Sequence, residues 1–415
     1  MLLKFTVGNY KVFKEKNILD LRATSLSELS DHNTLQVGTN TLLKSAIIYG
    51  KNASGKSKLL NALEFMADFV IESAKDRQIT DSIETDPFRL NQDNLKKASH
   101  FEVEFLLNET HYRYGFEVTQ ERVVKEWLLE RPKTKEYPLF LRIEDEFQID
   151  TKRFPEGKAK ESWTRKNALF LSLVAQLNGQ LSQEIIEWFS KLVFAHHFCD
   201  CEWHDDNVTE RLLNTNGNSK YKKAILELLQ KADIDINDIE LIEFNEARSS
   251  KTGKSIQTPY GESLIYTYHK KYGVDNKALE EVPFNLYEDE SAGTIRFFNL
   301  IGIILEALEN GEVVLLDEID GRLHTLLSKA IVLLFNSEKN RKAQFIFTTH
   351  DTNLLNKDLF RRDQIYFIEK DRYGAANTYA LSDFKINDQK VRKDADYESN
   401  YLKGKYGAIP FINNF

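Results

Sequence analysis

The chain has 415 residues, of which 41% are hydrophobic and 29% charged, and its net charge is −8 with a pI of about 5.7. This composition is typical of a globular protein of about two to three domains, and the acidic balance excludes a surface that coats nucleic acid along its whole extent. No apolar run approaches the roughly 20 residues needed to span a bilayer, so we expect no membrane segment. The N-terminal sequence MLLKFTVGNYKVFKEK lacks the long apolar stretch of a signal peptide. Two closely spaced cysteines, Cys199 and Cys201, are consistent with a cytoplasmic protein.

Local basic pairs could still form a small patch for nucleic acid, although solvated surface charge is the better explanation of each pair taken alone. The candidates are Lys96-Lys97, Lys222-Lys223, Lys270-Lys271 and Arg361-Arg362.

The first elements predict two short strands, Leu3–Val7 and Ile18–Leu21, around a turn at Gly8-Asn9. An apolar run ending at Ile47-Ile48-Tyr49 then leads into GKNASGKS, residues 50–57, which fits G-x-x-x-x-G-K-[ST] at every fixed position. The helical pattern that follows extends to about Lys75. The motif therefore has the strand–loop–helix setting that a phosphate-binding loop requires.

The residue types of this loop explain its chemistry. Glycines let several backbone N–H groups point at one phosphate chain, and the helix N-terminus adds a favourable dipole. Lys56 is expected to reach the β- and γ-phosphates, and the hydroxyl of Ser57 is expected to hold Mg²⁺. The sequence thus predicts a nucleotide site that uses Mg²⁺, although a phosphate loop alone does not choose among kinases, GTPases and transport-type ATPases.

A polar stretch, residues 76–98, is predicted to be a loop. Phe101–Leu107 and Tyr112–Val118 then alternate apolar and polar side chains across a short turn, which predicts a β-hairpin. Val123–Leu129 continues the strand pattern, so we expect an antiparallel sheet here.

Residues 155–232 carry helical patterns, and we expect a helical insertion there. Strand patterns return at Ile239–Phe244 and Leu264–His269. The expected domains are 1–154, the N-terminal half of a nucleotide-binding core; 155–232, the insertion; and 233–415, the C-terminal half.

The second half of the site is predicted where two further apolar strands end. Val313–Leu316 precedes Asp317, a candidate Mg²⁺ ligand, and Glu318, a candidate general base for the attacking water. Gln344–Thr349 precedes His350, a candidate contact of the γ-phosphate. Ser57 and Asp317 lie 260 positions apart (317 − 57), so a long insertion separates the two halves.

Residues 290–294, ESAGT, precede a helical run over 295–308. A hydroxyl residue and a glycine at a helix N-terminus form either an ordinary cap or a second anion site. Their position about 25 residues before Asp317 favours the anion site.

The order of these motifs resembles that of ABC-type ATPases of the SMC, RecF and RecN superfamily. The segments LLKFTVGNYKVF, LLDEID and TTH carry this resemblance. DEIDGRLH, FIFTTHDTNLL, RRDQIYFIEKD and YLKGKYGAIPF look like the defence-associated ATPases of the overcoming-lysogenization-defect and abortive-infection (AbiL/RloA) type. The resemblance implies an α/β ATPase head of a mixed sheet and an antiparallel sheet, with a helical insertion.

The resemblance also implies residue roles. Ser291 and Gly293 correspond to the signature that contacts ATP held by a second subunit, with Ala292 where transporters have glycine. Asp320 corresponds to a loop residue that touches the partner subunit, and Gln120 is the candidate for the metal-binding glutamine. The residues expected to contact nucleotide are Gly50, Asn52, Gly55, Lys56, Ser57, Lys58, Ser291, Gly293, Asp320 and His350.

A signature supplied by another chain predicts that ATP joins two copies and that hydrolysis loosens them. The resemblance implies a homodimer or larger homo-oligomer and a partner effector, namely a nuclease of the Toprim type, in protection against phage. A RecF-like repair ATPase that binds DNA directly, and a scaffold that binds ATP without turnover, are the alternatives.

Two further segments have open interpretations. Residues 196–204, HHFCDCEWH, are rich in metal-ligand types but lack a standard zinc spacing, and a strand followed by a polar loop is the other interpretation. The tail, residues 403–411, is either packed on the core or a docking segment for a partner.

Overall fold

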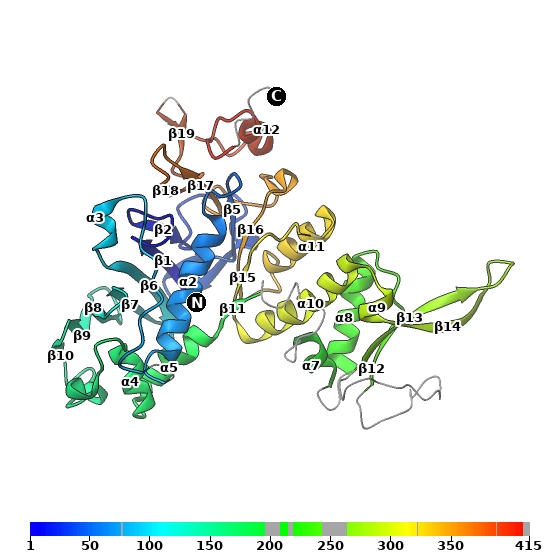
Figure 1. Ribbon diagram of the computed structural model, residues 1–415. Helices are drawn as coiled ribbons and strands as arrows, with labels where there is room; N and C mark the ends of the chain where they lie inside the picture. Colours follow the sequence, from blue (N-terminus) through cyan, green and yellow to red (C-terminus); the bar gives the residue numbers. More distant parts are fainter. Residues whose placement is uncertain are drawn as a thin grey trace. The chain divides into compact units, whose positions relative to one another are not determined.

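The computed structural model describes residues 1–75, 78–195, 208–214, 219–242, 264–321, 323–386 and 388–409 (Figure 1). The chain divides into two compact units. The first contains residues 1–194, 310–319 and 332–415, and the second contains residues 195–309 and 320–331. In the described part of the chain no helix is long and apolar enough to cross a membrane.

The first unit contains a six-stranded mixed sheet, and its central strands are entirely buried. The first five strands in spatial order are parallel, and the sixth is antiparallel to its neighbour. The order is β11 (Leu192–Phe194), β15 (Val313–Leu316), β16 (Gln344–Thr348), β5 (Ser45–Tyr49), β17 (Ile365–Lys370) and β18 (Ala376–Ala380). Continuous apolar runs such as SAIIY and VVLL suit parallel strands that are covered on both faces.

A seven-stranded antiparallel sheet forms the other layer of this unit. The predicted hairpin is confirmed, because Leu107 pairs with Thr110 across the two-residue turn Asn108-Glu109. Both turn residues have positive φ, as a hairpin turn of the I′ kind requires. The order is β10 (Glu146–Ile149), β9 (Tyr137–Ile143), β8 (Val123–Arg131), β7 (Thr110–Val118), β6 (Ser99–Leu107), β1 (Leu2–Gly8) and β2 (Asn17–Asp20).

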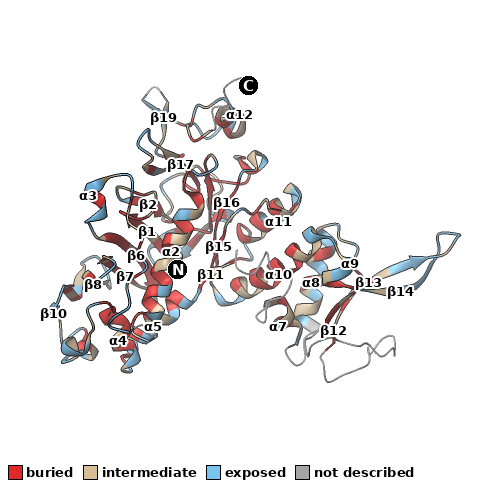
Figure 2. Cartoon of the chain, viewed as in Figure 1, coloured by how far each residue is buried: buried red, intermediate tan, exposed pale blue. Residues whose placement is uncertain are grey.

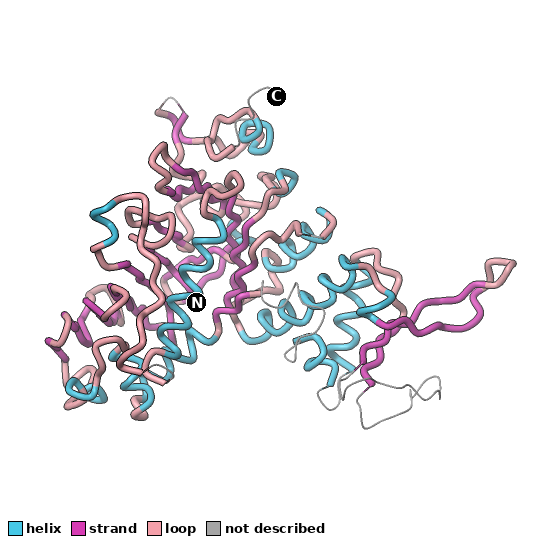
Figure 3. Tube along the Cα trace, in the orientation of Figure 1, coloured by secondary structure: helices cyan, strands magenta, loops and turns pink. Residues whose placement is uncertain are grey.

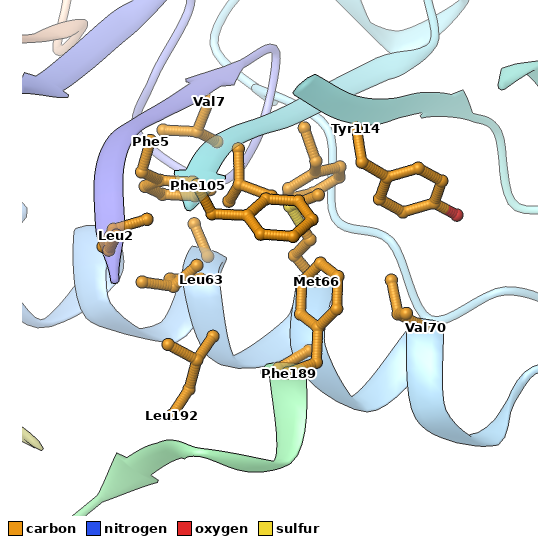
Figure 4. Packing of buried hydrophobic residues seen from close by; sticks show 14 of the residues in the cluster. Leu2, Phe5, Val7, Leu63, Met66, Val70, Phe105, Tyr114, Phe189 and Leu192 are labelled. Atoms are coloured by element: carbon orange, nitrogen blue, oxygen red, sulfur yellow. The ribbon is translucent and has the colours of Figure 1, made fainter. Parts of the chain in front are cut away.

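Helix α2 (Lys56–Glu72) joins the two sheets into one core. Leu63, Met66 and Val70 of α2 are buried against Phe105 of β6 and Leu192 of β11 (Figure 4). The same cluster includes residues of both sheets, so one hydrophobic core fills the space between them. The α/β class with a mixed and an antiparallel sheet is confirmed.

The boundary expected at residue 155 is wrong. Helices α4 (Phe170–Gln176) and α5 (Gln180–Ser190) belong to the first unit, and their side chains join its core. The buried Glu126 of β8 accepts hydrogen bonds from the N–H groups of Phe170 and Leu171 at 2.7 and 3.0 Å, which fixes the start of α4. Burial raises the pKa of Glu126 although Arg142 lies beside it. This long-range contact is not visible in the helical pattern of the sequence.

The second unit combines helices with a three-stranded antiparallel sheet (Figure 3). The predicted strands near 239 and 264 are observed as β12 (Asp238–Ile242) and β13 (Leu264–Tyr272), and β14 (Ala278–Asn285) completes the sheet. Residues 233–309 therefore lie in this unit and not in the C-terminal half of the nucleotide-binding core. Its helices are α7 (Val208–Asn214), α8 (Ser219–Lys231), α9 (Leu286–Asp289) and α10 (Ala292–Asn310), and α11 (Thr325–Phe335) begins in it.

Short elements complete the first unit, and Figure 2 shows the burial of residues along the chain. They are α1 (Ser30–Asn33), β3 (Thr34–Val37), β4 (Asn40–Leu43), α3 (Gln92–Leu95), η1 (Pro155–Gly157), η2 (Glu161–Trp163), η3 (Thr352–Leu354), β19 (Lys385–Ile386), β20 (Gln389–Lys390) and α12 (Tyr397–Leu402).

One of the basic pairs proposed as nucleic-acid contacts, Arg361-Arg362, has internal partners. Arg361 is 1% exposed and pairs with Asp363, and Arg362 pairs with Glu28. Arg361-Arg362 therefore stabilises the fold of the first unit and offers little charge to an external ligand.

A charge cluster on the antiparallel sheet gives the stability a pH dependence. Glu104 lies 2.6 Å from Lys4, 3.1 Å from His111 and 3.5 Å from Arg22. Burial opposes its ionisation, but hydrogen bonds from His111 and Lys4 and the nearby positive charges outweigh burial and hold the pKa of Glu104 well below its usual range.

We expect Glu104→Gln to lower the free energy of unfolding by about 2 kcal/mol at pH 7, because it removes the carboxylate that pairs with the partly buried Lys4 ammonium. A depressed pKa stabilises the fold above the unfolded value, about 4.3, and this contribution is lost as the pH falls further. Urea unfolding between pH 3 and 7 checks this, with exposed Glu146→Gln as the control. A difference between wild type and variant that stays constant over this range would contradict the assignment.

Candidate functional site

The phosphate loop connects β5 to α2 at the carboxyl edge of the parallel sheet. A Cβ atom on Gly50 would lie 2.5 Å from the carbonyl oxygen of Ile368, and one on Gly55 would lie 2.8 Å from Val12. Gly55 also has a φ of 121°. Side chains do not fit at either position, so both motif glycines are required by close backbone packing.

The loop is arranged as an anion site. Lys56 is only 5% exposed, and its Nζ donates to the carbonyl oxygen of Gly50 at 2.8 Å. The buried hydroxyl of Ser54, which lines the same pocket, has no hydrogen-bond partner among the described residues. Gly55 gives α2 no side-chain cap, so the N–H groups of its first turn remain available to a ligand.

His350 lies directly beside this lysine, with its Nε2 2.9 Å from Lys56 Nζ. A lysine ammonium can only donate, so this contact is a hydrogen bond in the tautomer in which His350 Nε2 carries no proton. The histidine follows β16, which is the parallel neighbour of β5. Two residues 294 positions apart are thus brought together because adjacent parallel strands end at the same edge.

The acidic pair after β15 is held by Thr348 at the end of β16. The Thr348 hydroxyl donates to a carboxylate oxygen of Asp317 and accepts from the backbone N–H of Glu318 at 2.8 Å. Glu318 has a φ of 51°, a conformation that costs a non-glycine residue energy and that surrounding contacts must hold. The backbone N–H of Ile319 also donates a hydrogen bond to the carbonyl oxygen of Thr348, which holds the segment after β15 against the end of β16.

The phosphate loop, Glu318 and His350 line a pocket of about 1010 Å³ in the first unit. Four of its lining residues within the described ranges are lysines and one, Glu318, is a carboxylate. Burial, together with the charges of Lys51 and Lys58, lowers the pKa of Lys370. Such concentrated positive charge suits a polyanion. The lining is Val12, residues 50–58, Glu318, His350, Thr352, Lys370, Tyr401, Leu402 and Ile409.

Most predicted residues of the first unit converge on this pocket. Those that line it are Gly50, Asn52, Gly55, Lys56, Ser57, Lys58, Glu318 and His350. Asp317 is connected to them through Thr348 and the adjacent Glu318.

Gln120 is not brought to this pocket. It lies in the turn between β7 and β8, where its Nε2 donates to the carbonyl oxygen of Thr85 at 3.4 Å. It lines a separate pocket of about 670 Å³, together with Lys96 and Lys97. The role of metal ligand expected for Gln120 has no support in this geometry, because the end of a strand in the antiparallel sheet does not position the turn beside the phosphate loop.

The predicted signature is in the second unit, at the start of α10. The Ser291 hydroxyl is exposed and accepts a hydrogen bond from the N–H of Thr294 at 3.1 Å, so the residue caps this helix. Gly293 and Asp320 are half-buried in the same unit.

The segment 196–204 lies outside the described residues, so its metal-binding interpretation stays a prediction. Elsewhere, within the ranges that the structure describes, no group of three or more His, Cys, Asp or Glu side chains could hold a metal ion. A Mg²⁺ site here would use Ser57 and Asp317 with nucleotide oxygens and water, which is the usual ligand set for this ion.

Sequence reasoning missed Thr348, Lys370 and the C-terminal residues of the pocket. A signal existed for Thr348, since a hydroxyl residue interrupts an apolar strand just before the histidine. Lys370 and Leu402 carry no motif, and only the fold brings them to the phosphate loop.

The phosphate loop, the acidic pair and the adjacent histidine define the class of P-loop nucleotide-binding proteins. A family model described as "AAA domain, putative AbiEii toxin, Type IV TA system" matches residues 45–356, which is three quarters of the chain. The chain belongs to this family of AAA domains.

Other comparisons describe similarity alone. No curated protein matches the chain. Among solved structures, an SMC head bound to the C-terminal winged-helix domain of ScpA has a TM-score of 0.48 at 13% identity, over 91% of this chain and 97% of that one. The SMC head domain from Thermotoga maritima has a TM-score of 0.42 at 14% identity, over 93% of this chain and 99% of that one.

The contacts of Thr348 lead to a prediction about ATP hydrolysis, the activity expected of this class. Thr348→Val preserves shape but removes the hydroxyl that positions Asp317 and Glu318, so we expect the turnover rate to fall about tenfold or more. The affinity for ATP should stay near that of wild type, and Thr348→Ser should restore most of the rate. Steady-state kinetics with a separate binding titration measure both quantities.

Thr6→Val is the matched control, because the buried Thr6 hydroxyl has no hydrogen-bond partner within the described residues. If Thr348→Val hydrolysed ATP as fast as Thr6→Val, the two hydrogen bonds of the Thr348 hydroxyl would have no part in activity.

Proposed function

We propose that this protein binds and hydrolyses Mg²⁺-ATP as the engine of an ABC-type assembly. One observation carries the proposal, namely that Lys56, Glu318 and His350 line one lysine-rich pocket whose loop has no room for side chains at its glycines. A phosphate loop without the acidic pair would support binding alone, whereas Glu318 adds a base for hydrolysis.

Each residue has a distinct part in this reaction. Lys56 and the backbone N–H groups of the loop bind the β- and γ-phosphates, and Ser57 and Asp317 hold the ion. The Mg²⁺ ion, when bound, neutralises charge on the phosphate oxygens. Glu318 accepts the proton of the attacking water, and its backbone is fixed by Thr348 so that the carboxylate does not have to be ordered during the reaction.

His350 is the proposed sensor of the γ-phosphate. Its ring beside Lys56 exchanges that contact for the terminal phosphate, and the ring then reports whether the nucleotide is a tri- or a diphosphate. The exchange requires Nε2 to carry the proton, because a phosphate oxygen accepts and the nitrogen that faces Lys56 must then donate.

The second part of the proposal is assembly through composite sites. Ser291 is exposed at the N-terminus of a 19-residue helix, where a partner's γ-phosphate would meet the hydroxyl and the positive end of the helix dipole. Gly293 and Asp320 are proposed to complete that contact. An exposed capping serine supports this role, since a buried one could not reach another subunit.

The biological role follows from analogy with relatives. The family description names AbiEii toxins of type IV toxin–antitoxin systems, and the motifs resemble those of AbiL/RloA-type defence ATPases. We therefore propose that the protein acts in abortive infection, in the cytoplasm, and that ATP turnover controls a separate effector such as a Toprim-type nuclease.

Assembly is tested with Glu318→Gln, which keeps the size of the side chain but removes the base. We expect this variant to bind ATP, to turn it over at least about 100-fold more slowly, and to accumulate as a dimer with ATP present. Light scattering with and without Mg²⁺-ATP measures the mass. Lys56→Ala is the control, because loss of the phosphate contact should remove both binding and the mass increase.

Two outcomes would contradict the proposal. An ATP-bound Glu318→Gln protein whose mass equals that of the nucleotide-free protein would exclude ATP-driven assembly. A Glu318→Gln protein with wild-type turnover would exclude the assigned base. Affinity capture of this variant from its host, compared with Lys56→Ala, then identifies the effector, and DNA recovered in a salt-dependent manner would favour the RecF-like alternative instead.

A further inference from the structure

The C-terminal segment, residues 397–409, forms one wall of the nucleotide pocket. Tyr401 and Leu402 at the end of α12 and Ile409 beyond it line the same cavity as the phosphate loop. The described part of the tail is packed on the first unit, as Tyr406 is fully buried. The packed interpretation of the tail is thus confirmed over residues 403–409.

Aromatic stacking and one backbone turn fix this wall. The Tyr401 ring lies 5.4 Å from Phe367 and 5.7 Å from Tyr49, between centroids, and Tyr49 immediately precedes the phosphate loop. Gly407 has a φ of 70°, and a Cβ there would lie 2.5 Å from a carboxylate oxygen of Glu369. The segment therefore has a defined position against β5 and β17.

The wall also contacts the loop that carries His350. Thr352 donates a hydrogen bond to Glu398 of α12 at 2.8 Å, and the Tyr49 hydroxyl donates to the carbonyl oxygen of Asp351 at 3.0 Å. The phosphate loop, the histidine loop and the C-terminal segment are thus parts of one packed site.

The chemistry of the wall differs from that of the rest of the pocket. Leu402 is 59% exposed although it is a large apolar residue, and Val12 and Ile409 line the same cavity. The phosphate loop contributes lysines, backbone N–H groups and hydroxyls. A pocket with one charged part and one apolar part matches a nucleoside triphosphate, whose base is flat and weakly polar while its phosphates are charged.

We infer that the C-terminal segment contacts the base of the nucleotide, through Leu402 and Ile409, with the Tyr401 ring holding them in place. This inference rests on the proposed ATP binding and adds a part of the chain that carries no nucleotide-binding motif. Leu402 would then be covered when nucleotide is bound, which removes its apolar surface from water.

The test compares ligands with and without a base. We expect Leu402→Gln and Ile409→Gln each to weaken Mg²⁺-ATP binding about tenfold, on the scale of a lost apolar contact in a ligand pocket. Binding of Mg²⁺-tripolyphosphate should be unchanged, because this ligand has phosphates only. Titration calorimetry on the full chain gives both dissociation constants, and Lys403→Gln, an exposed position next to Leu402, is the matched control.

The outcomes separate this inference from the proposed function. Equal losses for ATP and tripolyphosphate, or no loss for either, would overturn the base contact while leaving ATP binding established. A wild-type protein that binds no ATP would overturn both. Because Leu402 is largely exposed, its substitution should leave the fold intact, and an unchanged melting temperature of the nucleotide-free variant checks this.

Discussion

Burial of helix α2 is the constraint on which the rest of the first unit depends. The helix begins at Lys56 and buries Leu59, Leu63, Met66 and Val70 in the core that spans both sheets. Burying each such side chain contributes about 1.5–3 kcal/mol, so the helix cannot shift without losing several times the cost of distorting a loop. The phosphate loop at its N-terminus therefore has a fixed position, and the glycines of the motif allow the backbone to meet that position.

Parallel strand order explains how distant residues form one site. β15, β16 and β5 are neighbours, and their carboxyl ends carry the acidic pair, His350 and the phosphate loop. Long chain segments can be inserted between these strands because only the strand ends contribute to the site. The second unit is such an insertion, made at two separate points of the chain.

Much of this arrangement could be predicted from the sequence where short-range rules decide it. The strand–loop–helix context of GKNASGKS and the turn between β6 and β7 both depend on local backbone preferences and alternation. The domain boundary could not be predicted, because Glu126 fixes α4 from 44 residues away. The position of Gln120 after a strand carries no information about which sheet edge the residue lies on.

The contribution of the C-terminal segment to the pocket also could not be predicted from the sequence. Tyr401 and Leu402 belong to no pattern of nucleotide-binding residues, and their place depends on stacking with Phe367 and on the left-handed turn at Gly407. Thr348 was visible as part of a strand end, but its two hydrogen bonds depend on the exact register of β15 against β16.

The path of the chain around β15 has a mechanical consequence. The segment of the first unit that contains β15, residues 310–319, is joined to the second unit at both of its ends. Any force that the second unit exerts through the chain therefore enters β15 at one of its two ends, and β15 is hydrogen-bonded on its two sides to β11 and β16. Asp320 follows Glu318 by two residues, so only two peptide bonds separate this junction from the residue proposed as the general base.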